Sequence, residues 1–153
     1  MADGAARTSW WLKGNFAPVE REVEAFDLPV SGALPPELTG VFMRTGPNPA
    51  REPSPHWFLG DGMIHGVRLE KGKARWYRNR YVDTVLRQRN VSTRDPSVFM
   101  DRTASTANTN IARHGGRILA LEEAHFPYEI DGDLNTKGCL DFDGKLPHLR
   151  SPL

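Results

Sequence analysis

The segment IHGVRLEKGKARWYRNRYV, residues 64–82, decides the fold class. On both sides of the Lys71-Gly72 pair, the character of the side chain alternates from one residue to the next. Two runs with a period of two residues, joined by a two-residue loop that contains glycine, are typical of a β-hairpin. The segment therefore predicts two antiparallel strands whose aromatic side chains cover one face of a sheet.

Upstream of this hairpin the sequence predicts one more strand, from Leu38 to Arg44. The prolines of Gly46-Pro-Asn-Pro49 should end its ladder, because proline has no backbone N–H to donate. Fourteen glycines and twelve prolines punctuate the chain, and no window holds an apolar 3.6-residue period long enough to predict a helix.

Downstream, residues 110–113 and 118–123 flank the sequence His114-Gly115-Gly116 and predict a second hairpin. Residues 128–131 and 140–142 supply a third and a fourth short strand of this group. Short antiparallel strands at this spacing predict an all-β fold, either the blades of a propeller or a sandwich.

The composition excludes several classes of partner. Twenty Lys and Arg residues against nineteen Asp and Glu leave a net charge of +1, so no strong field favours nucleic acid. The single cysteine, Cys139, excludes an internal disulfide framework. The N-terminus has no signal-peptide run, and no stretch approaches the roughly 18 apolar residues of a spanning helix. We expect a soluble, cytoplasmic chain whose contact with a membrane would be peripheral.

Two histidines flank the glycine-rich stretch HWFLGDGMIHG at residues 56–66. A structural zinc site needs four clustered ligands, and neither paired cysteines nor a helical HExxH motif is present. The stretch Gly60-Asp61-Gly62 can adopt positive φ angles, and Asp61 can accept hydrogen bonds from its own backbone. His56 and His65 are therefore predicted to be structural groups beside a reversing turn, and not metal ligands.

Glu122, Glu123 and His125 lie close together in sequence, which suggests acid–base chemistry. A nucleophile is missing, since there is no GxSxG motif and Cys139 has no identifiable base near it. From the residues alone, the favoured interpretation is a strand end with solvated carboxylates.

Several motifs resemble, in their order, the N-terminal third of the carotenoid cleavage oxygenases. They are GNFAPV (14–19), LTGVFMRTGPNP (38–49), HWFLGDGMIHGVRLEKGKARWYRNRYV (56–82) and NTNIARHGGRILALEE (108–123). The resemblance implies the first blades of a seven-bladed β-propeller, with a non-haem Fe²⁺ ion held on its axis by four histidines. It also implies that dioxygen cleaves a C=C bond of an apolar carotenoid, apocarotenoid or stilbenoid substrate to give two carbonyl products. Open positions on an all-nitrogen iron centre suit dioxygen activation.

The resemblance assigns a role to Glu123 in the motif LALEEAHF. It matches the glutamate that accepts a hydrogen bond from an iron-ligating histidine and so fixes the tautomer of that ligand. In the strand predicted over residues 118–123, alternation places Leu119, Leu121 and Glu123 on one face and Ile118, Ala120 and Glu122 on the other. Glu123 alone is therefore expected to face the axis.

None of the five histidines matches an iron ligand of the family. The first ligand is expected in an Ala-His-Pro motif beyond Leu153, and His148 is followed by Leu149 where proline is expected. We expect a flexible N-terminus over residues 1–13, a partial propeller over 14–146, and an atypical, out-of-register tail over 147–153. The chain alone is not expected to bind iron.

Two functional hypotheses stay open at this point. The first is an N-terminal fragment of an iron(II) dioxygenase that is inactive alone. The alternative is a non-catalytic β-sheet module, in which the exposed Trp and Tyr edge from Trp76 to Tyr81 binds an apolar ligand or partner, or in which open strand edges pair with a full-length homologue. Because repeat architectures need about three units for stability, two isolated blades are expected to be poorly soluble or partly unfolded.

Overall fold

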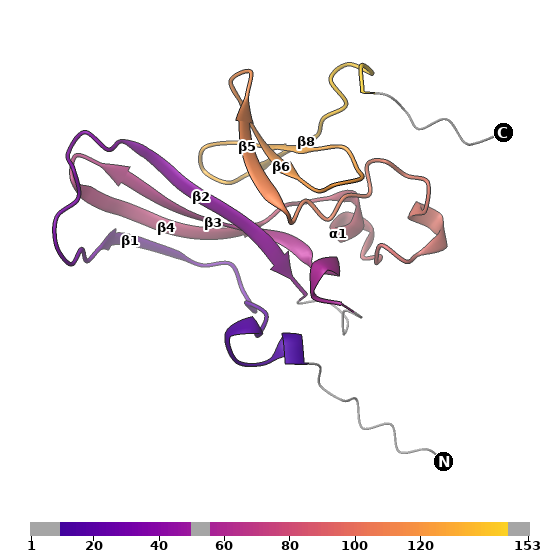
Figure 1. The fold of residues 1–153 in the computed structure, drawn as a ribbon, viewed down its shortest axis with the longest axis horizontal. Helices are drawn as coiled ribbons and strands as arrows, with labels where there is room; N and C mark the ends of the chain where they lie inside the picture. Colours follow the sequence, from indigo (N-terminus) through magenta and orange to yellow (C-terminus); the bar gives the residue numbers. More distant parts are fainter. Residues whose placement is uncertain (1–9, 50–55, 147–153) are drawn as a thin grey trace, which may run out of the picture.

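The computed structural model describes residues 10–49 and 56–146. In this part of the chain, two four-stranded antiparallel sheets are connected by loops and short helices (Figure 1). The all-β, antiparallel fold class predicted from the sequence is confirmed. Two four-stranded sheets also agree with the expected number of blades, since a propeller blade is a four-stranded antiparallel sheet.

The first sheet has the strand order β1-β4-β3-β2. Its strands are β1 (Glu24–Leu28), β2 (Gly40–Asn48), β3 (Asp61–Glu70) and β4 (Lys73–Tyr81). The hairpin predicted from residues 64–82 is confirmed, because β3 and β4 pair antiparallel on either side of Lys71 and Gly72. Both loop residues have positive φ angles, 49° at Lys71 and 72° at Gly72, as a tight hairpin turn requires.

The second sheet has the strand order β5-β6-β7-β8. Its strands are β5 (Asn110–His114), β6 (Arg117–Leu121), β7 (Tyr128–Ile130) and β8 (Thr136–Cys139). The hairpin predicted around residues 114–116 and the strand predicted from Tyr128 are confirmed. The strand predicted at residues 140–142 is wrong: β8 comes earlier, and positive φ angles at Phe142 and Asp143 turn the chain there.

Strand β2 runs further than the sequence predicts. Pro47 was expected to end the ladder, but it lies within β2, opposite Gly62 of β3. β2 is an edge strand of its sheet, where a residue whose amide nitrogen points outward needs no N–H. The position of the strand in the sheet therefore decides whether a proline ends it.

The reversing turn predicted at Gly60-Asp61-Gly62 is wrong. Gly60 is extended, with φ −68° and ψ 150°, and β3 already begins at Asp61. Glycine is needed here for space and not for a positive φ angle. A Cβ atom on Gly62 would lie 2.3 Å from the carbonyl oxygen of Ala107, which belongs to the segment that precedes β5.

The helical segments are η1 (Trp10–Leu12), η2 (Gly14–Phe16), η3 (Trp57–Leu59), α1 (Val85–Arg89) and η4 (Pro96–Val98). α1 was not predicted, since five residues are too few to show an apolar period. Local signals do mark its ends: the Thr84 hydroxyl accepts a hydrogen bond from the Arg87 N–H, and Asn90 is left-handed, with φ 54°. No helix in residues 10–49 and 56–146 is long and apolar enough to cross a membrane.

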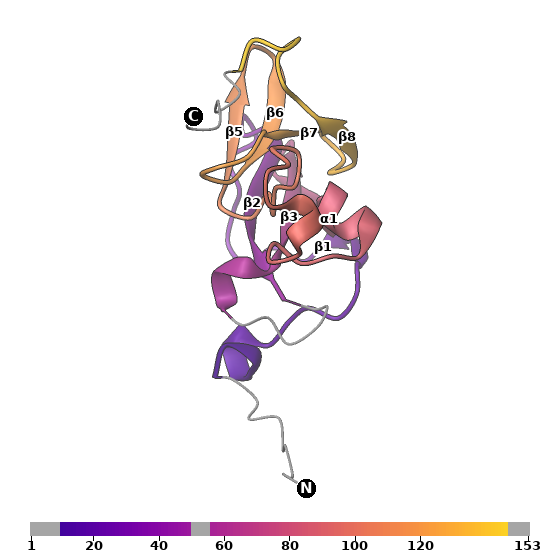
Figure 2. The ribbon, with the colours of Figure 1, turned by 90° about the vertical axis from the view of Figure 1, so that its right-hand side faces the viewer.

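The main hydrophobic core lies where the two sheets face each other, and β5 comes alongside β2 (Figures 1 and 2). Its buried members come from both sheets and from the adjoining loops: Ile64, Val82, Ala107, Ala120, Tyr128, Ile130 and Leu134. A smaller cluster of Leu86, Val98 and Ala104 holds α1 and the loop that follows it against this body. The apolar contacts of these two clusters therefore hold the sheets and the connecting loop together.

Candidate functional site

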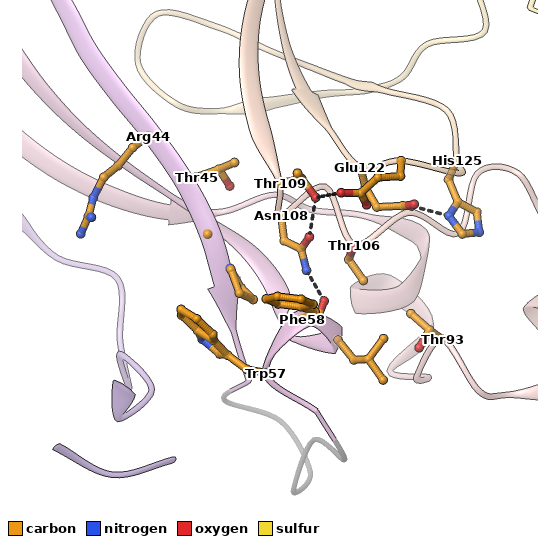
Figure 3. Close-up of a pocket in the computed structure, with 14 residues that line it drawn as sticks. Arg44, Thr45, Trp57, Phe58, Thr93, Thr106, Asn108, Thr109, Glu122 and His125 are labelled. Atoms are coloured by element: carbon orange, nitrogen blue, oxygen red, sulfur yellow. Dashed lines mark hydrogen bonds and ion pairs between the residues drawn. The ribbon is translucent and has the colours of Figure 1, made fainter. Parts of the chain in front are cut away.

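A pocket of about 630 Å³ lies between the C-terminal end of β2, η3 and the segments that flank β5 and β6 (Figure 3). Cavities of a few hundred Å³ are typical of small-molecule sites. Its lining residues are Arg44, Thr45, Gly46 and Pro47 of β2, Trp57, Phe58 and Leu59 of η3, and Thr93, Thr106, Asn108, Thr109, Glu122, Glu123 and His125. One side is therefore aromatic and apolar, and the opposite side carries carboxylate, amide and hydroxyl groups.

Trp57 and Phe58 form the aromatic wall of the pocket. The Trp57 ring meets Phe16 edge to face with 5.2 Å between centroids, whereas 67% of Phe58 is exposed. His56 precedes η3, and its Nδ1 accepts a hydrogen bond of 3.2 Å from the Phe58 N–H. This contact agrees with the structural role predicted for His56, although no reversing turn lies beside it.

Asn108 holds the aromatic wall in place from the polar side. Its side chain is buried, and its Nδ2 donates hydrogen bonds to the carbonyl oxygens of Phe58 at 2.8 Å and of Gly60 at 2.7 Å. Its Oδ1 accepts a hydrogen bond from the Thr109 hydroxyl at 3.2 Å. The sequence analysis missed both residues, because a polar pair before a strand is a common loop signal that predicts no particular contact.

Glu123, the candidate residue predicted from the sequence, lies at the pocket and accepts a hydrogen bond from the Thr109 hydroxyl at 3.2 Å. The strand alternation predicted for the glutamates is wrong. β6 ends at Leu121 and the chain then bends, so that Glu122 and Glu123 both line the pocket. A two-residue period applies only while the backbone is extended.

Glu122 forms an ion pair with Nδ1 of His125 (Figure 3). It also accepts a hydrogen bond from the Ala124 N–H. Burial acts to raise the pKa of Glu122, but the hydrogen bonds from His125 and Ala124 outweigh it, so the pKa of this carboxyl is lowered. Only 12% of the Glu122 side chain is exposed. The prediction of a solvated carboxylate is therefore wrong for Glu122, which is a charged and anchored group.

His65 lies in the middle of β3, away from any turn. Its Nδ1 hydrogen-bonds the hydroxyl of Tyr77 on β4 at 2.8 Å, which agrees with the predicted structural role. Burial and, after it, the positive charge of Arg44 lower the pKa of His65. The imidazole is therefore held neutral within the sheet.

The histidines that the structure describes do not converge on one point. His56 caps η3, His65 bonds within the first sheet, His114 ends β5 in an exposed position, and His125 pairs with a glutamate. His148 lies outside the described residues. Within residues 10–49 and 56–146, no group of three or more His, Cys, Asp or Glu side chains is arranged to hold a metal ion. These residues do not fit a four-histidine iron site.

The exposed aromatic edge required by the binding-module hypothesis is also wrong. β4 is an interior strand of its sheet, between β1 and β3. The guanidinium of Arg78 lies 4.6 Å from the centroid of the Trp76 ring. Tyr81 is half-buried and accepts a hydrogen bond of 2.6 Å from Nδ2 of Asn48.

The chain is similar to known proteins over the residues that form both sheets and the pocket. The RPE65 family, described as retinal pigment epithelial membrane protein, matches residues 16–152. The chain belongs to this family. The family match spans both sheets and every residue of the pocket.

This RPE65-family chain is 46% identical to the carotenoid cleavage oxygenase of Mycobacterium tuberculosis, over 95% of the chain and 30% of that protein. Its fold is similar to the crystal structure of the Pseudomonas brassicacearum lignostilbene dioxygenase, with a TM-score of 0.74 and 32% identity over 88% of the chain and 31% of that structure. The structure of a glutamate variant of the Synechocystis apocarotenoid oxygenase gives a TM-score of 0.68 at 29% identity, covering 86% of the chain and 32% of that structure. The chain thus spans about 30% of the length of the relatives that it matches.

Proposed function

We propose that this chain is part of a non-haem iron(II) oxygenase that cleaves a C=C bond of a carotenoid, apocarotenoid or stilbenoid into two carbonyl products. Family membership and the names of the three relatives support this reaction class. The pocket agrees with it, because an aromatic wall suits an apolar conjugated substrate.

Glu123 carries the proposal. Its carboxylate lies at the polar side of the pocket, opposite the aromatic wall, and the Thr109 hydroxyl restrains it. We assign to it a role as the acceptor of a hydrogen bond from the N–H of an iron-ligating imidazole. This bond would fix the tautomer and the ring orientation of that ligand. Glu123 is exposed in the described part of the chain, so its carboxylate has room for such a partner.

The positions of variants in the Synechocystis enzyme support this assignment. Crystal structures exist for variants of one of its threonines and of a glutamate fourteen residues further along. Thr109 and Glu123 are also fourteen residues apart and share a hydrogen bond. A further variant in that enzyme changes the residue directly before the glutamate, just as Glu122 directly precedes Glu123 in this chain.

The iron ligands themselves we assign to the part of the relatives' length that this chain does not span. Two facts support this: the described histidines are engaged separately, and the chain covers about 30% of those proteins. Titration of the 153-residue chain with Fe²⁺ in a calorimeter should accordingly give no one-to-one binding. Stoichiometric binding that is lost on substitution of His56, His65, His114 or His125 would contradict the assignment.

A graft tests the reaction class. Residues 16–146 replace the matching segment of the M. tuberculosis relative, and carbonyl products from a carotenoid and from a stilbenoid are quantified. The graft should cleave at least one of them, and Glu123→Gln should lower turnover by about 10–100-fold. Glu129→Gln is the matched control, since Glu129 lies on β7 and pairs with Arg117 outside the pocket. A folded graft without cleavage, or equal losses in both variants, would refute the proposal.

A further inference from the structure

We propose that Asn108 is a positioning residue that couples the aromatic wall of the pocket to the Glu123 carboxylate through the hydroxyl of Thr109. The inference rests on the proposed function only for the role that it gives to Glu123. The coupling itself is a property of four hydrogen bonds in the described part of the chain.

The orientation of the Asn108 amide follows from its partners. The nitrogen of the amide must face the two carbonyl groups, because neither carbonyl can donate a hydrogen bond. Nδ2 donates to the Phe58 oxygen at 2.8 Å and to the Gly60 oxygen at 2.7 Å. Oδ1 must then face Thr109, which it does at 3.2 Å. With 6% of the residue exposed, solvent offers little competition for these bonds. Asn108 therefore fixes the main chain of the aromatic wall and presents a single acceptor to Thr109.

The Thr109 hydroxyl lies between two acceptors. Its Oγ1 is 3.2 Å from Oδ1 of Asn108 and 3.2 Å from Oε1 of Glu123. A hydroxyl has one hydrogen to donate, so a stronger bond to one acceptor weakens the bond to the other. A change in the hydrogen bond to Glu123 therefore alters the hydrogen bond to Asn108, and a change at Asn108 alters the hydrogen bond to Glu123.

The main chain that follows the aromatic wall is closely packed. A Cβ atom on Gly60 would lie 2.7 Å from the backbone nitrogen of Pro49, so this end of η3 is packed directly against the end of β2. Asn108 holds the carbonyl oxygens of Phe58 and Gly60, so a displacement of this main chain changes the hydrogen bonds of its side-chain amide. A substrate that presses on the aromatic wall would in this way adjust the carboxylate on the opposite side of the pocket.

Hydrogen–deuterium exchange of the 153-residue chain tests the coupling without iron or turnover. The reporters are the Leu59 and Gly60 amides, which bond the carbonyl oxygens of His56 and Trp57. Glu123→Met removes one acceptor, so the Thr109 hydroxyl should bond Asn108 fully and slow exchange of both amides by about fivefold. Thr109→Val removes the donor and should speed their exchange by a similar factor of about five. In the Thr109→Val background, Glu123→Met should change nothing further.

Thr106→Val is the matched control, because Thr106 lines the same pocket but lies outside this chain of hydrogen bonds. In that background the effect of Glu123→Met on exchange should persist. Protection of the Ile64 amide in the core verifies that each variant folds. The coupling is refuted if Glu123→Met leaves the reporters unchanged, or if its effect survives Thr109→Val.

The outcome also separates this inference from the proposed function. A graft that cleaves its substrate while the exchange response is missing keeps the oxygenase proposal and refutes the coupling. An exchange response in a chain whose folded graft does not cleave refutes the oxygenase proposal and keeps the coupling.

Discussion

Arg78 and Asp133 join the two sheets: Nη1 of Arg78 in β4 lies 2.7 Å from Oδ1 of Asp133 in the turn between β7 and β8. The Asp133 side chain is 63% exposed, so solvent screening limits such a pair to about 0.2–1 kcal/mol. The next residue, Leu134, is fully buried in the core between the sheets. Apolar packing at Leu134, and not the visible ion pair, is therefore expected to hold the sheets together.

Leu134→Ala should lower the free energy of unfolding by about 2–5 kcal/mol, because it leaves a cavity in the core between the sheets. Asp133→Asn should cost less than about 1 kcal/mol. Urea unfolding followed by circular dichroism measures both changes. Equal losses in the two variants would show that the ion pair, and not the packing, dominates this contact.

Gly46 and Gly62 lie on the paired strands β2 and β3, and they test where glycine is needed for space. At Gly62, a Cβ atom would approach the backbone oxygen of Ala107 to 2.3 Å, whereas at Gly46 it would meet nothing within 4 Å. Gly62→Ala should therefore destabilise the fold by about 3 kcal/mol, since the contact is with backbone and cannot yield easily. Gly46→Ala should stay within about 0.5 kcal/mol. Thermal unfolding compares the two; similar melting temperatures would contradict the packing of β3 against the segment before β5.

The strands that the sequence predicted well are those in which periodicity and turn chemistry agree. The Lys71-Gly72 hairpin and the Gly115-Gly116 hairpin both combine alternation with a glycine turn. The errors lie where local signals depend on context. Pro47 is tolerated because β2 is an edge strand, and Gly62 is required by a neighbour that follows it by about forty-five positions and that no local pattern reveals.

The site was predictable only in part for the same reason. Family resemblance pointed to Glu123, and the structure brings it to the pocket. Thr109 restrains Glu123 and is bonded in turn to Asn108, whose amide contacts η3 and the residue after it, about fifty positions earlier in the chain. Such a contact leaves no periodic signal in a single sequence, because it depends on how the two sheets are packed.

Asn79 anchors the segment that leads into β1. It is fully buried, its Oδ1 accepts a hydrogen bond of 2.6 Å from the Val23 N–H, and its Nδ2 donates to the Arg21 oxygen at 3.1 Å. Asn79→Ala leaves these backbone groups without a partner and should cost about 1–3 kcal/mol. The Val23 amide should lose protection in hydrogen exchange, and the exposed variant Asn110→Ala should not affect it. Unchanged protection at Val23 would show that β1 pairing alone holds this segment.

His65 predicts how stability depends on pH. Burial and the charge of Arg44 lower the pKa of His65 in the folded chain, while the unfolded chain keeps a value of about 6.5. Between these two values the unfolded state binds a proton that the folded state does not. The free energy of unfolding therefore falls as the pH drops below about 6.5, and it levels off once the folded pKa is passed.

Urea unfolding between pH 7.5 and pH 5 in half-unit steps measures this dependence. The starting protein should lose stability across the lower part of that range, and His65→Gln should lose less, because glutamine does not titrate and can still hydrogen-bond Tyr77. His114→Gln, at the exposed end of β5, is the matched control and should follow the starting protein. If the slope survives in His65→Gln, the imidazole within the first sheet is not the group that makes this fold sensitive to acid.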